Sequence, residues 1–360
     1  MAYKKNKQKL PGLFVLVLIS TFAASYIGGV FFGRNITGLG WFVPLVFSIF
    51  IAVRNLRRRT FPIFLWLPWI ILLLLYLLVS NDATLDPRVS PSQRTLQVLA
   101  PLAVGLAAST YRPSSVVLEG CVTWLRRFAV LLFVALVGSS FTLIVAGGTS
   151  GLAAQVMTSM LLSVFFIVRY FIFGEKKDVV VYLMMAASPV LAITRTVMAA
   201  TLFNVPFSFA PIGKIKRLVL LGVVALIGFA VFNLPQVRRK MFYSGEGKLS
   251  EIGKDNEDFA LSGRGAIFDI LLNDVSDSPW VGHGTGAAET LTYAVSLVGY
   301  PHNDWLLTYF DYSLLGVVIY FLSNFLMMIH CVRSARQSSQ SQTKLFFLAG
   351  ASTFIPFMLV

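Results

Sequence analysis

Long apolar runs, separated by short polar and basic stretches, form the pattern of this chain. A helix needs roughly 20 apolar residues to cross the hydrocarbon core of a bilayer, and about eleven runs approach that length. The runs that predict membrane helices are about 10–32, 39–53, 61–80, 95–110, 128–145, 151–173, 179–193, 195–210, 217–234, 305–332 and 344–360. The pattern predicts an all-α integral membrane protein.

A single long polar stretch, 235–304, separates the ninth run from the tenth. Inside it we expect a short amphipathic helix around Arg264 to Val275 and a glycine-rich turn at Gly282 to Gly286. A loop of this length inside a compact protein is usually functional or disordered. We therefore expect three parts, namely a transmembrane bundle of about nine helices (1–234), a loop that carries the site motifs (235–304) and C-terminal transmembrane helices (305–360).

Basic residues predict the orientation. With the N-terminus in the cytosol, cytosolic segments hold 20 of the 30 lysines and arginines, with Arg126 and Arg169 among them. The short outer loops hold three, Arg34, Arg88 and Arg94. This asymmetry satisfies the positive-inside rule. It places 235–304 on the outer face and ends the eleventh helix outside. A chain that continued past Val360 would have a twelfth helix.

Composition excludes several classes of protein. The chain is 56% apolar and only 13% charged, with a mean hydropathy of +0.76, whereas a soluble domain carries about 25% charged residues. A cytosolic enzyme, a disordered tail and a disulfide-framed secreted module are excluded. The net charge of +14 is explained by the basic loops, so no nucleic-acid partner is expected.

Arg195 is the sharpest single feature of the sequence. It lies in Ala-Ile-Thr-Arg-Thr between two short apolar runs, where we expect the chain to turn near the outer interface. A guanidinium at the bilayer centre costs about 2.5 to 3.5 kcal/mol, so a partner should compensate. A phosphate of an anionic ligand is one candidate. The alternative is a snorkelling arginine paired with a carbonyl or carboxylate of the bundle.

Arg264 is the second candidate for binding an anion. It follows Ser262-Gly263 and precedes a helix-like run, which places it near a helix N-terminus, where backbone N–H groups favour anions. Two arginines could clamp a diphosphate. The alternative is an exposed arginine in a turn. We interpret Gly282 to Gly286 as a tight turn with a structural His283, because no strand precedes it.

The segment Pro301-His302-Asn303-Asp304 lies at the junction of the polar stretch and the next membrane helix. The pKa of a histidine lets it accept a proton near neutral pH, which makes His302 a candidate general base. In the structural alternative, Asn303 or Asp304 caps the helix and His302 merely precedes it. Asp311, two turns deeper, is a functional candidate because a carboxylate inside a membrane helix is costly; pairing with Arg195 is its alternative role.

Several other kinds of site are absent from the sequence. No His, Cys, Asp or Glu cluster has zinc-like spacing, and there is no nucleophile elbow or phosphate loop with its lysine. No metal and no cofactor is therefore expected. The chain also lacks two related halves with matched broken helices, which weighs against a secondary transporter.

The order of these motifs resembles that of the bacterial O-antigen ligase and polymerase superfamily, polytopic glycosyltransferases. The elements that carry the resemblance are Thr194-Arg195-Thr196, Ser262-Gly263-Arg264, Ser278-Pro279-Trp280-Val281-Gly282-His283-Gly284 and His302-Asn303-Asp304-Trp305-Leu306. Asp311 and Gly316 also match, whereas Ser313 replaces the first of two glycines. The resemblance is specific over about 190–320 and only architectural before that.

The resemblance implies a GT-C-like architecture in the bacterial inner membrane, with a cytosolic N-terminus and a periplasmic 235–304 loop. The donor would be a glycan linked to undecaprenyl diphosphate, and the acceptor a glycan or lipid A core. Arg195 and Arg264 would bind the leaving diphosphate, and His302 would take the acceptor proton. Asn303, Asp304 and Asp311 would support the site. The transfer would be inverting and metal-independent, and membrane lipid, a chain-length regulator and a flippase are further candidate partners.

Two classes of function remain in competition. The first is a transferase that polymerises repeat units of an O-antigen or exopolysaccharide, or that ligates a glycan to lipopolysaccharide core. The second is a transporter or flippase of an anionic lipid-linked substrate, with Arg195 and Asp311 along the path. The clustering of candidates at one membrane face favours the transferase. The 235–304 stretch has ten acidic and six basic residues, which favours a polymerase over a ligase that receives phosphorylated lipid A core.

Overall fold

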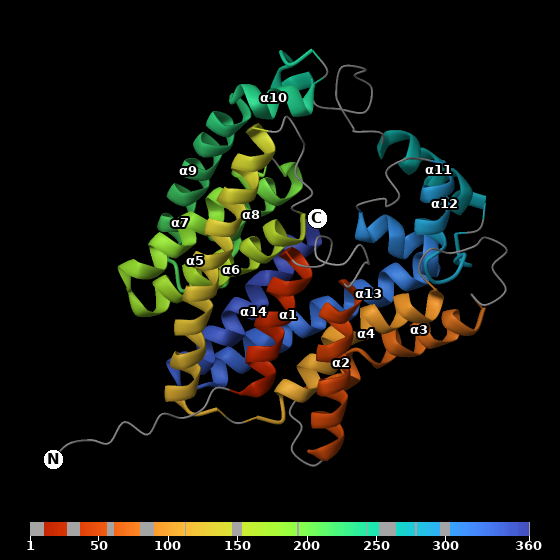
Figure 1. The fold of residues 1–360 in the computed structure, drawn as a ribbon, viewed down its shortest axis with the longest axis horizontal. Helices are drawn as coiled ribbons and strands as arrows, with labels where there is room; N and C mark the ends of the chain where they lie inside the picture. The colour runs from red at the N-terminus through yellow and green to blue at the C-terminus, as the bar shows by residue number, and fades with distance from the viewer. Residues whose placement is uncertain are drawn as a thin grey trace. The chain divides into compact units, whose positions relative to one another are not determined.

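The computed structural model describes residues 11–26, 37–55, 61–79, 90–111, 113–145, 153–192, 194–242, 244–251, 264–277, 279–295 and 303–359. Over these ranges the chain is helical, and they contain no strand. The helices labelled in Figure 1 are α1 (Gly12–Tyr26), α2 (Thr37–Arg54), α3 (Leu67–Val79), α4 (Pro91–Ala108), α5 (Ser115–Val145), α6 (Ala153–Phe173), α7 (Lys176–Leu191), α8 (Arg195–Phe207), α9 (Lys214–Phe232), α10 (Pro235–Met241), α11 (Arg264–Asp277), α12 (Ala287–Val295), α13 (Asp304–Gln337) and α14 (Ser341–Leu359). Two short 3-10 turns, η2 (Ile63–Leu65) and η4 (Leu249–Glu251), precede α3 and α11.

Each of the eleven apolar runs overlaps a helix, which confirms the all-helical prediction. Among the described residues, four helical segments are long and apolar enough to cross a bilayer: Ser115–Ser139, Val156–Phe173, Lys214–Phe232 and Asp304–Gln337. Shorter apolar helices lie in α1, α2, α3 and α8. This agrees with a membrane protein, while the number of eleven spans stays a prediction.

One helix begins much earlier than its apolar run. The run 128–145 predicted the start near residue 128, but α5 begins at Ser115 and carries Arg126 and Arg127 inside it. The guanidinium of Arg126 donates to Asp178, at 2.8 Å, and that of Arg127 lies 5.2 Å from the ring centroid of Trp124. Arg126 is paired with a residue of α7 and Arg127 with an aromatic ring of α5 itself. Because both charges have partners, α5 continues through them.

The chain packs into two compact units. Unit 1 consists of 1–61, 100–222 and 328–359, and unit 2 of 62–99 and 223–327 together with the last residue. In unit 1, α6 packs against α5, α7, α8 and α14, while α1 packs against α2. Fully buried side chains such as Phe166, Met185 and Leu345 fill the core around α6. The predicted division into bundle, loop and C-terminal helices follows the chain rather than these units and stays a prediction.

A cluster of ion pairs, centred on the buried side chains of Arg169 and Asp178, joins three helices of unit 1. The side chain of Arg169 on α6 is 1% exposed and forms an ion pair with the fully buried Asp178 of α7. Its guanidinium also donates to Glu175, at 2.8 Å, and to Glu119 of α5, at 3.0 Å. Buried charges are tolerated when they are paired and hydrogen-bonded. This cluster therefore fixes α5, α6 and α7 relative to one another.

In unit 2, α11 and α12 pack on the first turns of α13. Ile267, Leu271 and Val275 repeat every four residues on α11 and are at most 2% exposed, as one face of a helix requires. They form a core with Ala288 of α12 and Phe310 of α13. The amphipathic helix predicted around Arg264 to Val275 is confirmed, and its apolar face is the one that packs.

Candidate functional site

The glycine-rich turn between α11 and α12 lies along the backbone of α13. The amide of His283 donates to the carbonyl of Phe310, and that of Gly284 to the carbonyl of Asp311, both at 3.0 Å. A Cβ on Gly282 would lie 2.3 Å from the Asp311 carbonyl oxygen, closer than non-bonded atoms can approach. Glycine is therefore required at position 282 for the turn to lie on α13.

A break in α13 makes these carbonyls available. Ser313 has φ 67° and ψ −178° and interrupts the helical conformation. In an unbroken helix the amide of Leu314 would donate to Phe310, but here it donates to the carbonyl of Pro279, at 3.1 Å. The Phe310 carbonyl accepts from His283 instead. The break thus exchanges helical hydrogen bonds for bonds to the turn.

Ser313 occupies a conformation that glycine adopts far more readily than other residues. The superfamily resemblance places a glycine here, and the backbone geometry gives the physical reason. The hydroxyl of Ser313 is also buried, and within the described residues it has no hydrogen-bond partner. At the matching Gly316, a Cβ would lie 2.3 Å from the Cβ of Tyr312, so the second glycine of the pattern is needed for packing.

Asp311 has no exposed surface, and its carboxylate holds the start of α12. One oxygen accepts the amide of Gly286 and the other that of Ala288, each at 2.8 Å. A carboxylate at a helix N-terminus is stabilised by the free N–H groups and by the helix dipole. In the structure, Asp311 therefore stabilises the glycine-rich turn and the N-terminus of α12.

His283 is held on both ring nitrogens. Its Nδ1 lies 3.2 Å from the carbonyl oxygen of Phe310, and its Nε2 lies 3.2 Å from a carboxylate oxygen of Asp274. The ring stacks on Phe310 with centroids 4.2 Å apart. These contacts agree with the structural role that the sequence predicts for this histidine.

The two predicted arginines each begin a helix, Arg195 at α8 in unit 1 and Arg264 at α11 in unit 2. The chain turns between α7, which ends at Leu191, and α8, as predicted. The side chains of both arginines lie outside the described part of the structure, and so does His302.

Asn303 caps α13. Its side-chain oxygen accepts the amides of Trp305 and Leu306, each at 3.0 Å, which is the geometry of an N-cap. Asp304 is the first residue of the helix. Between the two residues proposed as caps, the structure therefore assigns the cap to Asn303. The cap also fixes the start of α13 directly after His302.

A cavity of about 240 Å³ lies beside Asp304 in unit 2. It is lined by α3, α4 and α13 through Trp69, Arg94, Gln97, Val98, Asp304, Leu307, Thr308, Tyr312 and Tyr320. Except for Asp304, sequence reasoning missed these residues. The available signal was Arg94, which was counted only as one of three basic residues in the outer loops.

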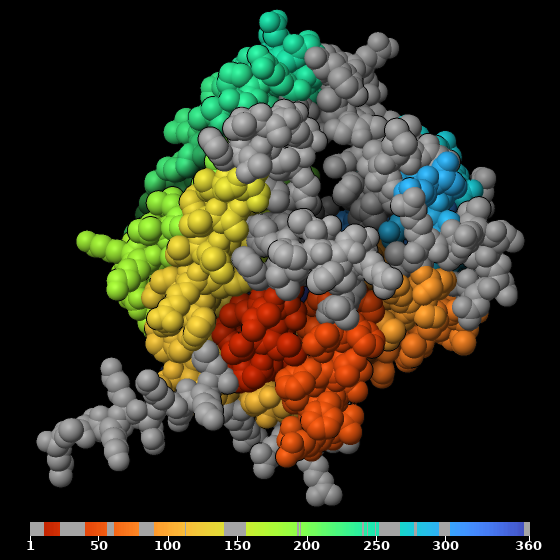
Figure 2. All heavy atoms as spheres, in the orientation of Figure 1, coloured from red at the N-terminus to blue at the C-terminus, as the bar shows by residue number. Residues whose placement is uncertain are grey.

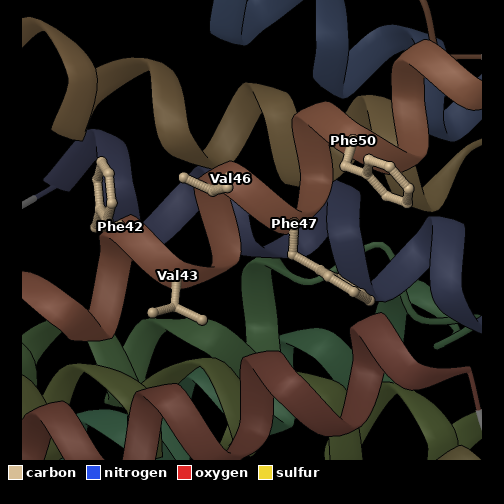
Figure 3. Close-up of a pocket in the computed structure, with 5 residues that line it drawn as sticks. All are labelled: Phe42, Val43, Val46, Phe47 and Phe50. Carbon is tan, nitrogen blue, oxygen red and sulfur yellow. The ribbon is translucent and has the colours of Figure 1, made fainter.

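A second hollow lies on α2 and is wholly apolar. Phe42, Val43, Val46, Phe47 and Phe50 line it, and Figure 3 shows their side chains along the α2 ribbon. Each of these residues is at least 40% exposed, and α2 is visible on the face drawn in Figure 2. A surface without polar groups can meet lipid but offers no acid, base or anion ligand.

Residues 180–321 match the family model described as O-antigen ligase. The match runs from within α7 to within α13 and includes Arg195, Arg264 and His302. No curated protein matches the chain. Within the described residues, no group of three or more His, Cys, Asp or Glu side chains could hold a metal ion.

Proposed function

We propose that the chain is a glycosyltransferase of the bacterial inner membrane. Residues 180–321 match the family model described as O-antigen ligase, a family of membrane enzymes of polysaccharide biosynthesis. The proposed enzyme moves a glycan from undecaprenyl diphosphate to a sugar hydroxyl of the acceptor at the periplasmic face. The family match carries this proposal, and it covers the three residues to which sequence reasoning assigned the chemistry.

Arg195 and Arg264 bind and stabilise the leaving diphosphate. When the bond between the anomeric carbon and the phosphate oxygen breaks, negative charge develops on the diphosphate, and positive groups placed there lower the barrier. Both arginines are the first residues of their helices. Their position supports this role, because free N–H groups and the helix dipole favour an anion at that end.

His302 acts as general base in a single displacement. The acceptor oxygen forms the new bond to the anomeric carbon with inversion, the diphosphate leaves with the bonding electrons, and His302 takes the hydroxyl proton. The Asn303 cap holds the backbone next to His302, and a fixed backbone supports precise placement of a base. No step requires a metal.

The charge of 235–304 favours a polymerase. The stretch carries ten acidic and six basic residues, and this excess of negative charge repels a phosphorylated lipid A core more than a neutral glycan chain. The proposed acceptor is therefore the growing end of a surface polysaccharide, and core ligation is the other member of the same reaction class.

The proposal is tested by deleting the gene and complementing the cells with wild type, Arg195→Ala or His302→Ala, followed by gels of surface polysaccharide. We expect both variants to fail although the protein reaches the membrane. Arg336→Ala and His330→Ala, at the other end of α13, are the matched controls and should complement.

The glycan that changes identifies the reaction. A core with a single repeat unit indicates a polymerase, as does loss of an exopolysaccharide alone, and a bare core with accumulated lipid-linked chains indicates a ligase. If deletion changes no glycan, or if both variants complement fully, the transferase proposal is wrong. A flippase for an anionic lipid-linked substrate then becomes the better interpretation.

A further inference from the structure

We infer that the cavity between α3, α4 and α13 is a sugar subsite that takes one pyranose ring of the glycan substrate. The inference rests on the proposed transferase function and goes beyond it, because Trp69, Arg94 and Gln97 lie outside the segment that matches the family.

Aromatic side chains form the apolar walls of the cavity. The ring centroid of Trp69 lies 5.2 Å from that of Tyr312 and 5.0 Å from that of Tyr320. Trp69 and Tyr312 are each 3% exposed, so packing holds these rings in place. Fixed aromatic rings offer a flat apolar surface, and a pyranose ring has a matching face of C–H groups.

Polar side chains with planar or hydroxyl groups complete the lining. Arg94 holds the amide oxygen of Gln97 at 3.4 Å, while Asp304 and Thr308 line the cavity from α13. A guanidinium presents a pair of donors, a carboxylate a pair of acceptors, and an amide one donor beside one acceptor. Such pairs fit two neighbouring hydroxyls of a sugar.

The charges of the lining favour a neutral ring over a phosphate or a lipid tail. Arg94 provides one positive charge and Asp304 one negative charge, and Glu289 lies 3.9 Å from the Arg94 guanidinium. A diphosphate would meet two nearby carboxylates. A lipid tail would place methylene groups against charged side chains, which is costly because the charges lose hydration.

The size and place of the cavity fit one ring at the reaction site. Its volume of about 240 Å³ is below the roughly 300 to 1,000 Å³ of pockets for drug-sized ligands, so it holds a single sugar rather than a chain. Asp304 lines it only two residues after His302. A ring bound there would contact Asp304, two positions after the proposed general base in the sequence.

The test measures binding to the full-length protein in lipid nanodiscs. Saturation-transfer difference NMR is recorded with the methyl glycosides of glucose, galactose and N-acetylglucosamine. We expect at least one glycoside to give ring-proton signals, and Gln97→Leu and Asp304→Asn to weaken that signal at least fivefold. Gln93→Leu, one turn away on α4 and not part of the lining, is the matched control and should bind as wild type does.

Three results would overturn the inference. They are no signal above empty nanodiscs for any glycoside, undiminished signals in both cavity variants, and displacement of the glycoside by inorganic pyrophosphate, which would assign the cavity to the diphosphate. His302→Ala separates this inference from the proposed function, because it changes none of the described lining residues, and glycoside binding should persist without activity. Transferase activity in the absence of glycoside binding would overturn the subsite alone.

Discussion

At two positions of unit 2, Gly282 and Ser313, the backbone geometry determines which residue type fits best. The turn at Gly282 and the break at Ser313 depend on each other, because the break supplies the carbonyls that the turn binds. A glycine at 282 lets the two backbones approach, whereas a serine at 313 accepts an unfavourable conformation. Local strain of this kind costs of order 1–3 kcal/mol per residue.

Ser313→Gly should stabilise the protein. Glycine adopts the φ of 67° without the steric cost that serine bears, and it removes the buried hydroxyl. We expect the free energy of unfolding to rise by about 1 kcal/mol, seen as a higher melting temperature in detergent. Ser323→Gly is the control, because this buried serine of α13 has helical backbone and its replacement should cost about 1 kcal/mol. A lower melting temperature for Ser313→Gly would show that the serine side chain is needed there.

Asp311→Asn should destabilise unit 2. The carboxylate accepts two backbone amides, and an amide side chain leaves one of them facing an N–H₂ group, at a cost of about 1–3 kcal/mol for a buried unsatisfied donor. We expect a lower melting temperature and less protein in the membrane. Asp304→Asn, at the exposed start of the same helix, should change the melting temperature much less; equal losses would argue against the cap.

Ion pairs join three helices of unit 1. From the sequence, the basic residues of these pairs predicted only the orientation of the chain in the membrane. Arg126 and Arg169 were counted among the cytosolic positive residues, yet both bind Asp178. Asp178 lies 52 positions from Arg126, and Glu119 lies 50 positions from Arg169, so no local sequence pattern predicts these two contacts. Once formed, such a cluster is most sensitive to the removal of one member.

Asp178→Ala should strongly destabilise the packing of α5, α6 and α7. It leaves the buried Arg169 with part of its charge uncompensated, and breaking a buried pair costs roughly 3–5 kcal/mol. We expect a large loss of folded protein in a thermal assay of detergent-solubilised membranes. Lys176→Ala, an exposed residue of the same helix, should leave the yield unchanged.

Stability should also fall in acid through Glu175. A hydrogen bond from Arg169 and its positive charge hold the pKa of Glu175 below its usual value. Because the folded pKa is the lower one, the stabilisation is complete above the ordinary glutamate pKa of about 4.3 and is lost as pH falls through the folded pKa. Melting temperatures measured below about pH 5 should fall less steeply for Glu175→Gln than for wild type. Equal slopes of melting temperature against pH in Glu175→Gln and wild type would show that the hydrogen bond between Arg169 and Glu175 contributes nothing to stability.

For the whole molecule, the distribution of basic residues makes a prediction about orientation. If the N-terminus is in the cytosol, as the basic residues predict, alkaline phosphatase fused after Glu251 should be active, because this position would then lie outside. Fused after Gly174 or after Ser338 it should be inactive, whereas green fluorescent protein at those two positions should fluoresce. The opposite pattern would invert the topology and place the candidate site on the cytosolic side.

The sequence by itself determined the helical nature of the chain, the approximate positions of the helices in its apolar runs and the order of its motifs. Apolar runs, caps and turn residues act over a few neighbouring positions, so they can be recognised locally. The helix at Arg264, the turn at Gly282 and a cap at Asn303 or Asp304 were all predicted in this way. The start of α5 was missed because Arg126 lies inside the helix, and its partner Asp178 is 52 positions away in the sequence.

Only the tertiary structure decided which distant residues meet. The hydroxyl of Tyr76 accepts the amide of Gly282, 206 positions away, and the cavity combines α3 and α4 with α13. Such contacts depend on how whole helices pack, and their register follows from shape and burial rather than from any periodic pattern. For the same reason Asp311, predicted from its depth in a helix, was placed on the N-terminus of α12 only by the fold.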